Sequence, residues 1–300
     1  MTDRATLSAV TRPGRYLGHE YNAILKPWES AAVRFNLIFP DLYEIGMSHQ
    51  GLQILYHILN KQENCLAERC YCPDIDMENL LRSQQKSLVS LESGRPLLDF
   101  DILGFTLPYE LCYTNILTVL DLGTIPLYSR DRDESYPLIL GGGACSLNPE
   151  PVADFFDAIL LGDGEESIVE ISDLLATHKN DTLEKDELLN LLAKVDGVYI
   201  PKHFEPEYNS SGHILAIHRR EGQITHVKRR VVASLDDIEH LKHPLVPNAK
   251  IVHDRLGIEV ARGCTRGCRF CQAGITYRPV RERSVEKIME LAGNGLKNSG

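Results

Sequence analysis

Three cysteines near the end of the sequence lie close enough to bind one metal centre. They are Cys264, Cys268 and Cys271, in the spacing C-x3-C-x2-C. Three thiolates on one loop can hold an iron–sulfur cluster, whereas a cluster ligated by protein alone takes a fourth ligand. No fourth cysteine lies nearby in the sequence. Three protein ligands would therefore leave one iron open for a small molecule.

The residues between and before these cysteines suit a negatively charged centre. Arg262, Arg266 and Arg269 would offset the charge of a cluster. Gly263 and Gly267 would let the backbone wrap tightly and bring N–H groups close to sulfur. The sequence therefore predicts an anionic metal centre on a basic loop.

A structural zinc site is the alternative interpretation of the same cysteines, with His253 as a fourth ligand. Zinc sites of this kind usually combine two closely spaced ligand pairs. The sequence shows no second pair near the cysteines. The spacing therefore favours the iron–sulfur cluster over zinc.

The elements that precede the cysteines follow a regular order. Apolar strands alternate with amphipathic helices between residues 33 and 176, which is typical of a doubly wound parallel sheet. The predicted strands are Val33–Phe39, Ala67–Cys72, Asp101–Leu107, Leu138–Leu140 and Ala158–Leu161, and the predicted helices are Ser48–Asn60, Asp76–Gln85, Leu111–Leu122 and Glu165–Ala176. The carboxylates of Gly162–Glu166 stand at the start of the last helix, where the helix dipole favours them, so we interpret them as capping residues.

The alternation stops after residue 176. Residues 177–190 are mostly polar, which predicts a solvated helix or connector. Short β-type pieces follow at Gly197–Ile200, His213–His218 and Thr225–Val232, separated by Pro, Asn, Ser and Gly. We expect a connector and a small β-rich bridging module here.

A strand–loop–helix pattern returns around the cysteines. It consists of a strand at Gly257–Val260, a loop at Ala261–Arg283 and a helix that begins after the N-cap Ser284. The apolar face of that helix is predicted to carry Val285, Ile288, Met289 and Ala292. Because one βα unit takes about 30 residues, we expect a further domain to begin here without being completed before Gly300.

The cysteine loop resembles that of the radical S-adenosylmethionine (SAM) superfamily, in which a C-x3-C-x-aromatic-C loop follows the first strand of an incomplete TIM-like barrel. Phe270 occupies the aromatic position. The resemblance implies that Cys264, Cys268 and Cys271 ligate a [4Fe-4S] cluster and that Phe270 flanks the adenine of SAM. It also implies reductive cleavage of SAM to a 5′-deoxyadenosyl radical, with flavodoxin or ferredoxin as electron donor. Beyond the cluster ligands, no catalytic residue is identified.

The order of the parts resembles proteins in which a cobalamin-binding-type flavodoxin-like domain precedes a radical SAM barrel. The first loop of such a domain reads D-x-H-x-x-G, and its histidine ligates cobalt. Here Asp41 and Gly46 match, Tyr43 replaces the histidine, and Gly142 and Gly143 supply the later glycine pair. Tyrosine is no substitute for a neutral nitrogen ligand, so any bound cobalamin would lack one from the protein. A domain that kept this fold without the cofactor is an equal alternative.

Several longer segments resemble one family of long radical SAM proteins, among them Gly162–Glu166 and Arg278–Ser284. The implied organisation is an N-terminal extension (1–32), a cobalamin-binding-type flavodoxin-like domain (33–176), a connector and β-rich bridging module (177–250), and the truncated start of the radical SAM domain (251–300). The implied fold class is α/β, with a flavodoxin-like doubly wound parallel sheet and the first βα unit of the barrel. The substrate is left open between RNA, protein and a small molecule, and this chain alone is expected to be inactive.

Composition limits the remaining function classes. The chain has 300 residues, 43% of them hydrophobic, and a net charge of −10. No apolar stretch is long enough to cross a membrane, and the first residues lack the apolar core of a secretory signal, which predicts a cytoplasmic protein. Residues 250–300 contain ten Lys and Arg against five Asp and Glu, which indicates an anionic partner. A ligand-sensing α/β module with a zinc-stabilised, basic RNA-binding tip is therefore the alternative function.

Overall fold

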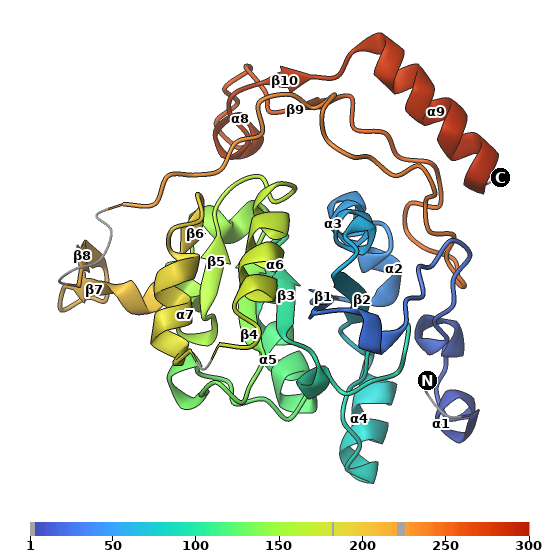
Figure 1. The fold of residues 1–300 in the computed structure, drawn as a ribbon, viewed down its shortest axis with the longest axis horizontal. Coiled ribbons are helices and arrows are strands. Elements are labelled where there is room, and N and C mark those ends of the chain that lie inside the picture. The colour runs from blue at the N-terminus through green and yellow to red at the C-terminus, as the bar shows by residue number, and fades with distance from the viewer. Residues whose placement is uncertain (1–3, 182, 221–225, 300) are drawn as a thin grey trace.

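A six-stranded sheet forms the centre of the computed structural model, which describes residues 4–181, 183–220 and 226–299 (Figure 1). Its strands are β1 (Val33–Phe39), β2 (Cys65–Tyr71), β3 (Ile102–Thr106), β4 (Leu138–Gly142), β5 (Ala158–Leu160) and β6 (Val198–Tyr199). The spatial order is β2-β1-β3-β4-β5-β6; β1 to β5 are parallel, and β6 is antiparallel to β5. The order 2-1-3-4-5 is that of flavodoxin-like folds, so the predicted fold class is confirmed.

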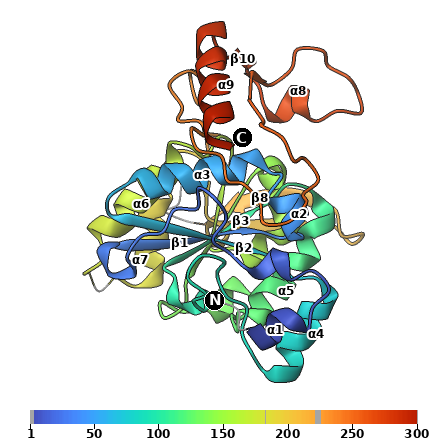
Figure 2. The same ribbon diagram turned by 90° about the vertical axis from the view of Figure 1, so that its right-hand side faces the viewer.

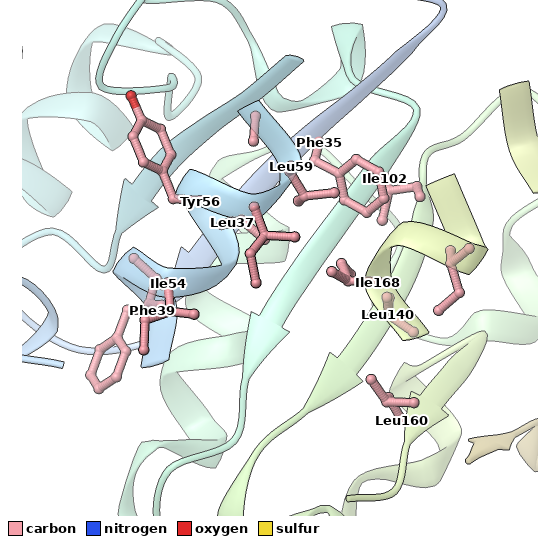
Figure 3. Packing of buried hydrophobic residues seen from close by; sticks show 14 of the residues in the cluster. Phe35, Leu37, Phe39, Ile54, Tyr56, Leu59, Ile102, Leu140, Leu160 and Ile168 are labelled. Carbon is pink, nitrogen blue, oxygen red and sulfur yellow. The ribbon is translucent and has the colours of Figure 1, made fainter. Parts of the chain in front are cut away.

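Both faces of the sheet are covered, as a parallel sheet requires. Helices α3 (Gln50–Lys61) and α6 (Ser167–Thr177) lie on one face, and α4 (Ile75–Gln84) and α5 (Tyr113–Leu122) lie on the other (Figure 2). Strand β1 alternates accordingly, with Leu37 packed towards α3 and α6 and Ile38 packed towards the opposite face. Leu59 and Ile168 join Leu37 in the same apolar cluster (Figure 3).

The remaining elements connect or extend this sheet. They are α1 (Arg4–Ser8), α2 (Tyr43–Gly46), α7 (Lys185–Leu192), β7 (Phe204–Tyr208), β8 (Ile214–Arg219), β9 (Ala261–Arg262), α8 (Ala273–Thr276), β10 (Arg281–Glu282) and α9 (Val285–Ser299). Helix α7 packs against α6 and buries Leu189 and Leu192. The stretch predicted to be solvated therefore contains part of the core.

Two predicted strands are wrong in the described residues. Residues 226–232 form no strand, and their sheet contact is a single parallel bridge from Arg230 to Gly162; Thr225 lies outside the described residues. Residues 257–260 are also not a strand, and pairing begins only at β9, which is antiparallel to β10. Both stretches have β-type composition, but a strand also needs a neighbour with free backbone groups beside it.

No helix in the described residues is long and apolar enough to cross a membrane.

His49 caps the helix that follows β1. Its Nδ1 accepts a hydrogen bond from the Leu52 N–H at 3.1 Å, and its ring lies 5.1 Å from the ring of Phe39. Burial lowers the pKa of His49 from 6.5 to about 4. The unfolded chain therefore binds a proton between these pH values while the folded protein does not, so the free energy of unfolding falls as the pH drops through this range.

We expect this loss to reach about 2 kcal/mol between pH 7 and pH 5. Asparagine keeps a capping oxygen but does not titrate. Urea denaturation of the wild type and His49→Asn at both pH values should show a smaller pH dependence in the variant. An equal pH dependence in the two proteins would contradict the assignment to His49.

Candidate functional site

The C-terminal part of the chain crosses the carboxyl edge of the sheet, where ligands of doubly wound folds bind. The Val252 N–H donates to the Glu44 carbonyl at 3.3 Å, and the His253 N–H donates to Ser48 Oγ at 3.0 Å, both in the region after β1. The chain then reaches the loop after β5 through Arg262. Figure 1 shows this orange and red segment above the ends of the strands.

The three predicted cysteine ligands lie on one exposed loop between β9 and β10. Cys264 is half-buried, Cys268 and Cys271 are exposed, and none forms a disulfide. The Arg266 N–H lies 3.4 Å from Cys264 Sγ, and the Cys271 N–H donates to the Cys268 carbonyl at 3.1 Å. All residues from 265 to 272 are exposed, so packing gives the tip of this loop no support.

Free thiols on one loop are the donor set that an iron–sulfur cluster needs, and in this respect the residues fit. The loop does not draw the donors together by itself: among the described residues, no group of three or more His, Cys, Asp or Glu side chains converges into a metal site. The same result applies to the predicted zinc site with His253. The cluster-ligand roles of the three cysteines stay a prediction.

A buried network of charges holds the base of the cysteine loop. Arg262 Nη1 lies 3.0 Å from Asp163 Oδ1, and Arg262 Nη2 donates to Glu165 Oε1 at 2.6 Å. Arg262 Nε donates to Glu259 Oε1 at 2.8 Å. From the other end of the loop, Arg281 donates to Asp163 Oδ2. Both ends of the cysteine loop are therefore bound to the loop that follows β5.

Electrostatics within this network favour the charged forms of Asp163 and Arg262. Burial opposes the charged form of Asp163, but Arg281, the Val232 N–H and Arg262 outweigh it and hold the pKa of Asp163 below its usual value. Burial likewise opposes the charge on Arg262, yet Glu259 and Glu165 raise its pKa. Asp163 and Arg262 are therefore both charged at neutral pH.

The prediction that Gly162–Glu166 serves as a helix cap is wrong. Helix α6 begins at Ser167, and Glu166 at its N-cap position makes no side-chain capping bond. Asp163 and Glu165 bind Arg262 instead. Gly162 has φ +107°, and a Cβ there would lie 2.1 Å from the Arg230 carbonyl oxygen. The sequence signal for this function was the dense Gly-Asp-Gly-Glu-Glu run directly after a buried strand.

The basic excess of residues 250–300 is only partly available to an outside partner. Arg262, Arg281 and Arg283 are turned inwards, where burial lowers the pKa of Arg283. Arg262 was expected to offset the charge of a cluster, but its side chain binds Asp163, Glu165 and Glu259 instead. The exposed arginines of the cysteine loop are Arg266, Arg269 and Arg278.

The basic stretch Lys228–Arg230, which precedes the C-terminal part, also bonds within the protein. Arg229 donates to the Thr276 carbonyl at the end of α8. Arg230 pairs with Glu166 and Glu170, at 2.7 Å in each case. Two of its three cations, Arg229 and Arg230, are therefore engaged by the chain itself.

Phe270 and two residues of the predicted apolar face of α9 are exposed. Phe270, the predicted SAM contact, is 93% exposed. The Ser284 N-cap is confirmed by the bond from the Lys287 N–H at 3.2 Å. On α9, however, Val285 and Met289 are exposed while Leu291 is buried, so the predicted apolar face is partly wrong.

The predicted cobalamin residues have contacts inside the protein. The Tyr43 hydroxyl donates to Glu20 Oε1 at 3.1 Å and accepts from the Asn248 N–H at 3.1 Å. Asp41 accepts from the Tyr109 hydroxyl and from the Leu42 N–H. Tyr43 is buried, which does not suit a cobalt ligand.

The three glycines of the cobalamin prediction differ in what their surroundings require. A Cβ at Gly46 would lie 2.4 Å from the Tyr71 ring, so packing alone demands glycine there. Gly143 has φ +120°, and a Cβ at Gly142 would meet nothing closer than 3.7 Å. Cobalamin binding stays a prediction.

Comparison with known proteins identifies the family. Residues 51–201, which are 151 of the 300, match the family described as "Radical SAM proteins, N-terminal". The chain belongs to this family of radical SAM proteins. The matched region covers most of the sheet and ends before the cysteine loop.

Two individual proteins are similar over most of the chain. The uncharacterized protein MJ0966 of Methanocaldococcus jannaschii is 24% identical over 264 residues, which are 87% of this chain and 46% of that protein. A structure of the radical SAM methyltransferase TsrM from Kitasatospora setae, with tryptophan substrate and a SAM analogue bound, matches with a TM-score of 0.44 and 15% identity, covering 86% of this chain and 44% of that one. The chain spans about half the length of the curated relative it matches.

Proposed function

We propose that this chain supplies the α/β domain and the cluster-binding loop of a radical SAM enzyme. Cys264, Cys268 and Cys271 would hold a [4Fe-4S] cluster, and Phe270 would flank the adenine of SAM. The observation that carries the proposal is the C-x3-C-x-aromatic-C loop in a chain that belongs to a radical SAM family. When bound, such a cluster supplies the electron that cleaves SAM reductively to a 5′-deoxyadenosyl radical.

The chain's own residues would contribute ligation, access and charge. The thiols of Cys268 and Cys271 are exposed and free of disulfides, so no packing has to be broken for them to bind iron. The exposed loop also leaves the centre within reach of an electron donor such as flavodoxin or ferredoxin. Arg266 and Arg269 are exposed on the same loop and would lower the electrostatic cost of an anionic cluster beside them.

Metal analysis after anaerobic reconstitution tests this proposal. We expect about four iron and four acid-labile sulfide ions per chain, as one [4Fe-4S] cluster requires. Addition of SAM to the reduced protein should change the EPR spectrum of the cluster, because one iron has no protein ligand. Zinc at about one equivalent, without iron or sulfide, would overturn the proposal and support a structural zinc site.

SAM cleavage is measured separately from SAM binding, because few residues of this chain surround the cysteine loop. We expect negligible 5′-deoxyadenosine from the 300 residues alone, even with a complete cluster, because β9, β10, α8 and α9 provide little enclosure around the loop. Chromatography of the quenched reaction measures this product. Sustained formation of 5′-deoxyadenosine would contradict the expectation that these residues are insufficient.

A further inference from the structure

The tip and the base of the cysteine loop differ in how they are held. Residues 265–272 are all exposed. The base is formed by β9 and β10, in which Arg262 pairs with Arg281 and Ala261 with Glu282. The positions of the three thiols therefore depend on this short ladder, together with the bond from Arg229 to the Thr276 carbonyl in α8.

A two-residue ladder is too short to be stable alone, and its side chains show what holds it. Arg262 and Arg281 are neighbours across the ladder, and both bind the carboxylate of Asp163, one at each oxygen. Asp163 is itself fixed, because its N–H donates to the Arg230 carbonyl at 3.0 Å and its Oδ2 accepts from the Val232 N–H at 2.9 Å. One buried carboxylate therefore clamps both ends of the cysteine loop.

Glu165 reinforces this clamp from the same loop. Its Oε1 accepts from Arg262 at 2.6 Å, while its buried Oε2 has no hydrogen-bond partner among the described residues. Glu259 completes the set by binding Arg262 through both carboxylate oxygens, at 2.8 and 2.9 Å. Arginine suits this position because its planar fork holds five N–H donors in fixed directions, whereas lysine offers a compact point charge with three rotating donors.

We propose that Asp163 and Glu165 are positioning residues for the cluster-binding loop, through which the carboxyl end of β5 sets the place of the three cysteines. The inference rests on the proposed function only for the role of the loop in binding a cluster. The clamp itself rests on the contacts of Asp163 and Glu165. Fixing both ends of a loop lowers the conformational entropy that metal binding must remove. The α/β domain thus prepares the cysteine loop before any metal is present.

Hydrogen–deuterium exchange of the metal-free, full 300-residue chain tests the clamp independently of any cluster. In Asp163→Asn, the peptide spanning 258–284 should exchange at least about tenfold faster than in the wild type, because local opening of the ladder becomes easier. The amide of Arg283, which donates to the Val260 carbonyl at 2.9 Å, reports this opening directly. Exchange of β1, β3 and β4 should stay unchanged.

Matched variants separate the clamp from general loss of stability. Glu170→Gln removes an exposed partner of Arg230 outside the clamp and should leave the 258–284 peptide unchanged. Arg262→Lys keeps the charge but loses the fork, and should behave like Asp163→Asn. If Asp163→Asn does not fold, Glu165→Gln provides the same comparison with a milder change, since one oxygen of Glu165 has no partner.

Reconstitution with iron adds a second measurement, which would stay unchanged if the clamp had a purely structural role. In folded Asp163→Asn, we expect iron uptake to fall to less than about half and the EPR spectrum of the cluster to broaden, because the thiols sample more positions. Exchange of the 258–284 peptide that matches the wild type would overturn the clamp, whatever the iron content. Suppose that the wild type binds no iron, while the 258–284 peptide still exchanges faster in Asp163→Asn than in the wild type. That result would overturn the proposed function and leave the clamp standing.

Discussion

Replacing Cys268 by alanine should remove the reconstituted cluster. Cys268→Ala would leave two thiolates for a cluster that is proposed to have only three protein ligands, and two are too few to hold a [4Fe-4S] cluster. We expect the iron content of Cys268→Ala to fall to less than about a quarter of the wild-type value. Iron and sulfide analysis measures the loss of the cluster, together with the visible absorbance that arises from sulfur-to-iron charge transfer.

Cys145→Ala is the matched control for this experiment. Cys145 is also a free, partly exposed cysteine, but it follows β4 and lies outside the cysteine loop. The control should keep its iron, and so should variants of the buried cysteines Cys65, Cys70, Cys72 and Cys112 if they fold. Iron retained by Cys268→Ala, or lost equally from Cys145→Ala, would show that the cluster ligands are elsewhere.

Replacing Arg69 by methionine should destabilise the α/β domain by about 3–5 kcal/mol. Arg69 is fully buried in β2, where it donates to Glu92 at 2.6 Å and to Glu20 at 2.9 Å. Its guanidinium also lies 5.0 Å from the centre of the Tyr56 ring. Methionine would leave two buried carboxylates without their cation. Burial already raises the pKa of Glu92 in spite of Arg69, so without Arg69 the charged form of Glu92 would be costlier still.

A double-mutant cycle shows whether the pair or the packing carries this effect. Glu92→Gln removes one of the two stranded charges, so Arg69→Met should cost less in that background. Arg82→Gln, which removes an exposed pair with Glu78 on α4, is the control and should change the free energy of unfolding little. If Arg69→Met does not fold, Arg69→Lys replaces it in the cycle. This variant keeps the positive charge and loses the two-sided fork that binds Glu20 and Glu92. Equal cost of Arg69→Met in both backgrounds would contradict a role for charge pairing.

The sequence by itself determined the elements whose apolar pattern is complete within one segment. The predicted strand Val33–Phe39 agrees with β1, and the predicted helix Ser48–Asn60 agrees with α3 to within two residues at each end. Apolar periodicity within one segment decides such elements. The cysteine donor set is equally local, because its chemistry depends on residue types and spacing within one loop.

Tertiary structure alone decided which charges meet. Arg281 and Asp163 are 118 positions apart, and Arg262 and Glu165 are 97 apart. Each side chain, considered in its own segment, suggested something else: the carboxylates a helix cap, and the arginines an anionic partner. Tyr43 likewise binds Glu20 and Asn248 from distant parts of the chain. Charges pair through space in a buried environment, so their partners depend on how the chain crosses the sheet and not on spacing along the sequence.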